Sequence, residues 1–287
     1  LLLLSMSGSI AQSAAMNRAG KKEARTASDL YLFNLLSVAV GTLVILLWSG
    51  VPRASFFTLA LGAAFGVATN LNMLFNLLAL GSGPMCYTQL IVSSSMLVPA
   101  LSGALIWSEP LSPLNVAGAA LMMLSLALSV EYKKGDGARA NLRWFLCCMG
   151  SFCAGGSVGV MQKVLGYSAY AEEQKGFLAA AFLVSLLCAA GNWLFSCCVR
   201  RVPQEMKLRP AVWLLAAASG GGIAAANILN LYLANVMPSI IFFPLFNGGV
   251  LLASVAIAFL VFRERLKPQQ TAGFLIGLAA VAILCLA

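Results

Sequence analysis

The side chains of this sequence best suited to bind a solute are amides and a hydroxyl that lie inside long apolar runs. An amide offers hydrogen-bond donors and an acceptor, and it lacks partners in lipid, so we expect it to face the interior of a helical bundle. The candidates are Gln12, Asn72, Asn76, Gln89, Ser93, Gln162, Asn227, Asn230 and Asn247. For each residue the alternative is a hydrogen bond between helices, worth roughly 0.6 kcal/mol on average. For the set as a whole we favour a solute-binding cavity.

Ionisable chemistry is sparse in the same runs. All nine acidic residues lie in connections or at run ends, and the sequence has no histidine. A proton-coupled carrier usually holds a titratable acid at membrane depth, so we expect no coupling through a buried carboxylate. Uniport, solute exchange or another coupling ion stays open.

Other kinds of site fit the residues poorly. The eight cysteines form no CxxC pattern, so we expect neither a metal site nor a cofactor. An intramembrane enzyme would need a nucleophile with a base at depth. Residues 93–95 are three serines, but no base accompanies them. We therefore do not expect an enzyme.

The composition requires a membrane. Of the 287 residues, 61% are hydrophobic and 9% are charged, whereas a soluble domain carries about 25% charged residues. The net charge of +9 comes from basic residues in or beside short connections, which favours headgroup contacts over nucleic acid. A membrane-spanning helix needs about 20 apolar residues. Ten runs predict such helices: 1–16, 30–48, 56–80, 85–107, 114–130, 142–164, 176–198, 211–234, 239–261 and 269–287.

A repeated pattern opens the fifth and the tenth run. In each copy an acid precedes a proline, and both suit the first turn of a helix, where a donor is not needed and the dipole is positive. Matched positions of the two copies lie 155 residues apart in every case. The matched pairs are Glu109 and Glu264, Pro113 and Pro268, Gly118 and Gly273, and, further upstream, Asn72 and Asn227.

Two repeats of five helices have a topological consequence. Because five is odd, the second repeat must cross the membrane in the opposite sense, which is typical of transporters that alternate access to a site near the midplane. The predicted fold is therefore an all-α integral membrane protein with ten transmembrane helices in an inverted 5+5 repeat, residues 1–130 and 142–287. In this arrangement Asn72 and Asn227 would face each other across a central cavity.

The basic residues predict an orientation. Connections after odd-numbered runs hold 15 Lys and Arg, against 3 after even-numbered runs, if Arg143 and Lys163 are counted with their adjacent connections. The positive-inside rule places the first set in the cytoplasm. We therefore predict that the connections 17–29 and 199–209 share one side of the membrane, the cytoplasmic one.

The ten runs and the twofold Glu-x-Leu-x-Pro pattern resemble the EamA-like branch of the drug/metabolite transporter superfamily. The residue before the acid is Ser108 or Arg263, where that family typically has glycine. The resemblance covers essentially the whole chain. It implies a solute carrier, often an exporter or an exchanger, with a central cavity lined by the first, third, fourth, sixth, eighth and ninth helices.

We thus predict a multi-pass secondary transporter of a small organic solute in the plasma membrane. Its partners would be the solute and the lipid bilayer, without nucleic acid, and its oligomeric state stays open. The alternative is an ion channel or a Mg²⁺-type carrier of the same architecture, although a cation path normally shows acidic rings, which this sequence lacks. The two acids of the repeat are predicted to serve as helix starts, with gating or loop anchoring as the sharper alternative.

Overall fold

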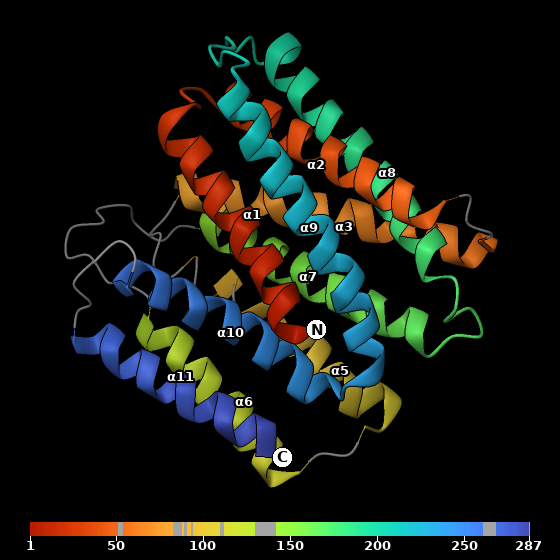
Figure 1. Ribbon diagram of the computed structural model, residues 1–287, viewed down its shortest axis with the longest axis vertical. Helices are drawn as coiled ribbons and strands as arrows, with labels where there is room; N and C mark the ends of the chain where they lie inside the picture. The colour runs from red at the N-terminus through yellow and green to blue at the C-terminus, as the bar shows by residue number, and fades with distance from the viewer. Residues whose placement is uncertain are drawn as a thin grey trace. The chain divides into compact units, whose positions relative to one another are not determined.

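The computed structural model describes residues 1–50, 54–82, 88, 91–92, 94–109, 112–129, 142–260 and 268–286. Over these residues the protein is α-helical without a strand. With the labels of Figure 1, the helices are α1 (Leu2–Lys22), α2 (Ala27–Ser49), α3 (Phe56–Ser82), η1 (Ser94–Met96), α5 (Leu97–Trp107), α6 (Pro113–Ser129), α7 (Leu142–Gly166), α8 (Gln174–Leu194), η2 (Phe195–Val199), α9 (Pro210–Val236), α10 (Ser239–Leu260) and α11 (Pro268–Leu286).

The helix bounds follow the apolar runs closely, with three differences. The first run is longer than predicted, because α1 continues to Lys22. Within the fourth run, the short 3₁₀ turn η1 directly precedes α5. The seventh run ends in the π-helical turn η2 rather than in regular α-helix. Prolines open α6, α9 and α11, as expected where the first turn needs no amide donor.

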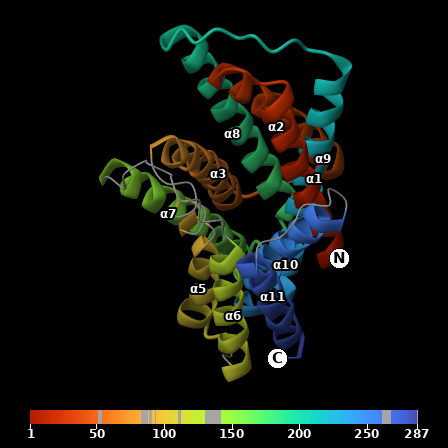
Figure 2. The ribbon, with the colours of Figure 1, turned by 90° about the vertical axis from the view of Figure 1, so that its left-hand side faces the viewer.

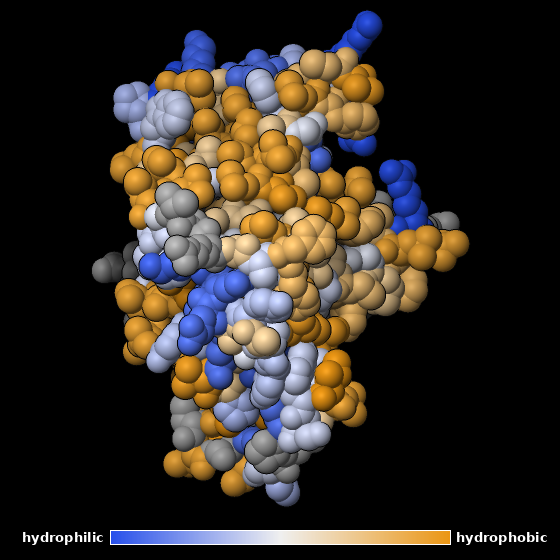
Figure 3. All heavy atoms as spheres, turned by 90° about the vertical axis from the view of Figure 1, so that its right-hand side faces the viewer, coloured by the Kyte–Doolittle hydropathy of each residue, from blue (hydrophilic) through white to orange (hydrophobic). Residues whose placement is uncertain are grey.

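Five helices are long and apolar enough to cross a membrane. These candidate spans are Ala27–Ser49, Phe56–Asn76, Leu142–Gly166, Gln174–Val199 and Pro210–Val236. Other apolar helices are shorter over their described residues, among them Ser94–Trp107 and Pro113–Leu128. Large apolar side chains point outward, and Figure 3 shows hydrophobic residues over much of one face. The length and composition of these helices indicate a membrane protein.

The chain divides into two compact units, and each unit combines segments from both halves of the sequence. Unit 1 contains residues 1–70 and 165–232, and unit 2 contains residues 71–164 and 233–287. Neither unit coincides with one of the predicted repeats.

In unit 1, α2 packs along α8, and the two helices lie side by side in Figures 1 and 2. The Thr42 hydroxyl donates to the Phe182 carbonyl oxygen at 3.2 Å. The helices α1 and α9 cross at Gly8 and Gly222, where a Cβ on either residue would meet the backbone of the other helix. Small residues thus allow close helix contacts, as they do in membrane bundles.

In unit 2, α6 packs along α11. Gly118 admits the Leu284 side chain, and the Ser125 hydroxyl donates to the Gly273 carbonyl oxygen at 2.7 Å. Beside them, α10 packs on α6 at the contact between Gly248 and Met122. The two glycines of the repeated pattern are therefore packing positions of this unit.

Candidate functional site

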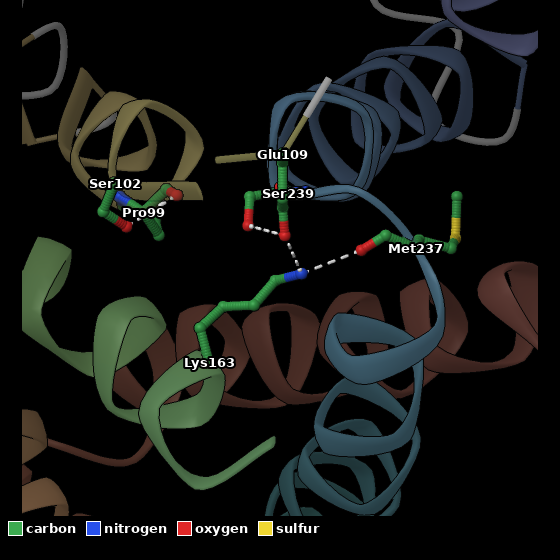
Figure 4. Close-up of polar contacts among 6 residues, drawn as sticks. All are labelled: Pro99, Ser102, Glu109, Lys163, Met237 and Ser239. Carbon is green, nitrogen blue, oxygen red and sulfur yellow. Dashed lines mark hydrogen bonds and ion pairs between the residues drawn. The ribbon is translucent and has the colours of Figure 1, made fainter. Parts of the chain in front are cut away.

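An ion pair is buried in unit 2. The Lys163 Nζ lies 2.8 Å from the Glu109 Oε1, and the two side chains are only 2% and 6% exposed. The same ammonium donates to the Met237 carbonyl oxygen at 2.9 Å (Figure 4). Lys163 comes from the end of α7, Glu109 from the connection after α5, and Met237 from the connection before α10. Charges so deeply buried need such partners, because desolvation penalises each of them.

The Glu109 carboxylate also caps α10. The Ser239 N–H donates to the Glu109 Oε2 at 2.6 Å, and the Ser239 hydroxyl donates to the Glu109 Oε1 at 3.2 Å (Figure 4). A negative charge is favourable at this end of a helix. From the sequence we predicted that Glu109 serves the start of the helix that follows it, with gating or loop anchoring as the alternative. The side chain instead caps α10, whose first residue lies 130 positions later.

Local backbone geometry explains how Glu109 reaches this position. Helix α5 ends at Ser108, which adopts the left-handed conformation with φ of 52°, and the Glu109 N–H returns to the Gly103 carbonyl oxygen at 3.1 Å. This turn directs Glu109 back along α5. A Cβ on Gly103 would collide with the Glu109 carboxylate and with Ser239. Glycine at position 103 is therefore required for the approach.

The Glu109 carboxylate is held in its ionised form. Burial by itself would raise the pKa of Glu109, but the hydrogen bond and charge of Lys163 and the donors of Ser239 outweigh it and lower the pKa. At neutral pH the pair is therefore ionic. A carboxylate whose pKa is lowered is a poor proton carrier.

The burial of Lys163 changes the count of basic residues in the connections. In that count Lys163 was grouped with the connection after the sixth run, but it is 1% exposed and belongs to the interior of unit 2. Without it, the connections after even-numbered runs hold two basic residues, so the predicted orientation is unchanged. The signal for its role was a lysine inside the apolar run, one residue before its end.

The amide candidate Asn72 contacts α7 in the same unit. The Ser151 hydroxyl donates to the Asn72 Oδ1 at 2.6 Å. The Asn72 amide also borders Gly155, together with the Ser95 hydroxyl. One helical turn along α3, the Asn76 Oδ1 is buried and has no hydrogen-bond partner among the described residues. Sequence reasoning missed Ser151 and Ser95, because short hydroxyl side chains are common in apolar helices.

The other amide candidates are distributed over both units. The Nδ2 groups of Asn227 and Asn247 donate to the carbonyl oxygens of Ile223 and Phe243, four residues earlier in the same helix. The Asn230 Oδ1 accepts from the Ser5 hydroxyl at 2.5 Å. Asn72 belongs to unit 2 and Asn227 to unit 1. Their predicted arrangement across one cavity therefore stays a prediction.

Of the remaining candidates, four are described and three lie outside the described residues. Gln162 is 5% exposed and precedes Lys163, and Gln12 is partly buried on α1. Pro113 and Pro268 are the first residues of α6 and α11, as predicted. Gln89, Ser93 and Glu264 lie outside the described residues. Within the described part of the chain, no three His, Cys, Asp or Glu side chains are grouped to hold a metal ion.

Unit 1 brings together the two connections that were predicted to share a side of the membrane. The Asp29 carboxylate accepts hydrogen bonds from the backbone N–H groups of Arg25 and Thr26 at 2.9 and 3.0 Å. It accepts two more from Glu205 and Met206, both at 2.8 Å. The connection before α2 and the connection before α9 therefore meet on one buried side chain.

Comparisons with known proteins support the fold and nothing finer. No family model and no curated protein matches the chain in sequence. One solved crystal structure of a protein superposes with a TM-score of 0.76, over 99% of this chain and 96% of that chain, at 17% sequence identity. At that identity the similarity establishes a shared fold. The class defined here is therefore an all-α protein with at least five helices suited to a membrane.

Proposed function

We propose that this protein is a secondary transporter of a small organic solute, with ten membrane spans arranged as an inverted 5+5 repeat in the plasma membrane. The observation that carries the proposal is the Glu109–Lys163 ion pair buried among apolar helices. Ionisable groups within membrane bundles are expensive and usually mark a functional pathway.

The contacts of both units agree with the ten-span topology. In unit 2, Glu109 and Met237 lie in connections that follow even-numbered spans of the proposed topology, and both contact Lys163, near the end of another even-numbered span. The connections joined by Asp29 follow odd-numbered spans. The packed pairs α2–α8 and α6–α11 each join corresponding helices of the two proposed repeats. These contacts are those expected of an inverted repeat.

The polar groups of unit 2 indicate what kind of solute could be moved. The ion pair has no net charge. In the same unit, Asn72 and Asn76 on α3 and Ser151 on α7 supply neutral donors and acceptors. This chemistry suits a polar or amphipathic solute bound without a fixed counter-charge. The resemblance to the EamA-like branch of the drug/metabolite transporter superfamily adds export or exchange as the mode of transport.

Solute binding can be tested on purified protein by a thermal-stability screen, since a ligand of the folded state raises the melting temperature. Asn72→Ala should weaken the affinity for any solute found at least five-fold, the equivalent of about 1 kcal/mol. The control is Asn192→Ala, because the Asn192 Nδ2 makes a comparable 2.7 Å bond to the Asn70 Oδ1 in unit 1. This control should lower the melting temperature and leave solute affinity unchanged.

Reconstitution then separates transport from conduction. Proteoliposomes should show saturable counterflow of the solute identified by the screen. Single-channel currents in planar bilayers, without saturable counterflow, would instead establish the channel alternative. Equal losses of affinity in Asn72→Ala and Asn192→Ala would assign the Asn72 amide to packing rather than to the solute.

A further inference from the structure

A segment of unit 1 presents basic side chains on a fixed backbone. This strap, residues 200–209, connects η2 to α9 without regular secondary structure. The backbone N–H groups of Glu205 and Met206 in the strap donate hydrogen bonds to the Asp29 carboxylate. The Ser28 hydroxyl donates to the Val202 carbonyl oxygen at 2.9 Å. The strap is thus attached to the first turn of α2 at three backbone positions.

The strap is also anchored by packing. Met206 is 5% exposed and belongs to a buried cluster with Leu32, Phe33, Val212 and Ala216, from α2 and α9. The Ser28 hydroxyl lies 2.8 Å from the Ser196 hydroxyl of η2. A connection with a buried anchor and several backbone hydrogen bonds keeps its exposed side chains in defined places.

Half of those exposed side chains are cationic. Arg200, Arg201, Lys207 and Arg209 are all exposed, and Glu205 is the acid among them. Arg25 is exposed as well, and its backbone N–H shares the Asp29 carboxylate with the strap. Five basic side chains are therefore held around one buried anchor.

Apolar side chains are interspersed among the cations. Phe195, Val199 and Leu208 are 50%, 66% and 51% exposed. The Arg200 guanidinium lies over the Phe195 ring, 5.6 Å from its centroid. Leu208 stands between Lys207 and Arg209. The strap follows directly on the candidate span Gln174–Val199, where a membrane changes from acyl chains to headgroups. Basic groups next to exposed apolar groups fit that boundary.

We propose that the strap and Arg25 form a docking surface for the phosphate groups of anionic phospholipids. The guanidinium and ammonium groups bind headgroup phosphates, while Phe195, Val199 and Leu208 contact the upper acyl chains. Arginine is well suited to this role because the paired N–H donors of its planar guanidinium group match the geometry of phosphate oxygens. The inference is independent of which solute the protein moves, and of whether it transports at all.

The first experiment measures lipid stabilisation of the full chain in detergent at physiological salt. Added phosphatidylglycerol should raise the melting temperature more than phosphatidylcholine does. The variant Lys207→Gln/Arg209→Gln should weaken apparent phosphatidylglycerol affinity roughly five-fold per cation removed, which corresponds to about 1 kcal/mol each. The matched control, Arg143→Gln/Lys175→Gln, removes two exposed cations elsewhere and should retain the wild-type affinity.

A second variant separates a positioned site from general electrostatic attraction. Asp29→Asn makes the chain more positive, so attraction by net charge alone would strengthen phosphatidylglycerol binding. We expect weaker binding, because the strap loses its anchor. Ser28→Ala should weaken binding in the same direction without any change of charge, and it serves where Asp29→Asn does not fold.

Four results would overturn the proposal. The first is an equal loss of phosphatidylglycerol affinity in the strap variant and in its matched control, and the second is a rise in melting temperature with phosphatidylcholine as large as with phosphatidylglycerol. The third is tighter phosphatidylglycerol binding in Asp29→Asn together with unchanged binding in Ser28→Ala. The fourth is stabilisation by inorganic phosphate as large as that by phosphatidylglycerol. The last result would identify a site for a free anion in place of a lipid surface.

Discussion

Asp29 in unit 1 and Glu109 in unit 2 are both buried carboxylates, but the protein compensates their charges differently. Asp29 is fully buried and accepts four backbone N–H donors from two connections. Glu109 combines one backbone N–H and a hydroxyl from Ser239 with the ammonium of Lys163. Backbone donors are fixed by the fold, whereas a lysine side chain has four rotatable bonds.

The difference separates a structural carboxylate from one that can change partners. Rearranging Asp29 would unfold the connections that it joins. Glu109 and Lys163 could part by side-chain rotation, at the cost of two uncompensated charges. We therefore assign Asp29 to stability and place the Glu109–Lys163 pair in the proposed transport machinery.

Removal of Lys163 should have the largest effect. Lys163→Met leaves Glu109 buried without its cation, and breaking such a pair typically costs about 3–5 kcal/mol. Chemical unfolding in detergent would measure the loss. Because the hydrogen bond and charge of Lys163 help to lower the pKa of Glu109, the pKa should rise in the variant. Part of the lost stability should therefore be regained at acid pH, where the carboxyl group is protonated. Lys175→Met, at an exposed position, is the control, and a loss below about 1 kcal/mol in Lys163→Met would contradict the assignment.

Asp29→Asn should be destabilising by roughly 1–3 kcal/mol, the cost of leaving buried donors unsatisfied. In the variant, the Nδ2 group of the new asparagine would face two backbone N–H groups whose acceptor in the wild type is a carboxylate oxygen. Hydrogen exchange should accelerate at Glu205 and Met206, whose amides bind Asp29. Glu205→Gln, at an exposed side chain, should leave these rates unchanged. Unaltered exchange in Asp29→Asn would mean that the strap is held by packing alone.

The double variant Glu109→Gln/Lys163→Met separates the role of the ion pair in stability from its role in transport. Replacing both members of a buried pair is often neutral, and glutamine can still accept from the Ser239 N–H. We expect stability within about 1 kcal/mol of the wild type together with impaired solute transport. Full transport by the stable double variant would remove the ion pair from the transport machinery.

The smallest effect is expected at Glu173, a carboxylate nearer the surface. Its side chain accepts from the Ser55 N–H and hydroxyl, both at 2.8 Å. Hydrogen bonds from the Thr58 side chain and from Ser55 lower the pKa of Glu173. Because the folded pKa is the lower one, the stabilisation is present above the unfolded value of about 4.3 and is lost as the pH falls below it. Between pH 7 and pH 3, the melting temperature of Glu173→Gln should fall less with decreasing pH than that of the wild type. An identical fall in both proteins would contradict this role.

Local sequence signals were sufficient to locate the helices. Apolar run lengths and the prolines at positions 113 and 268 placed α6 and α11 within one residue of their observed starts, because these signals act within one helical turn. The run of residues 56–80 likewise became α3. The length of an apolar run and a proline at a helix start are local signals, so no knowledge of the neighbouring helices was needed.

Which polar groups meet depends instead on how the helices pack. Glu109 and Lys163 are 54 residues apart, and Ser151 and Asn72 are 79 residues apart. Nothing in the local pattern distinguishes Glu109 from a solvated helix-end acid, and the position of Lys163 inside an apolar run does not identify its partner. Their pairing depends on the packing of α5, α7 and α10, which sets the side chains that share a low-dielectric interior and therefore the charges that must neutralise each other.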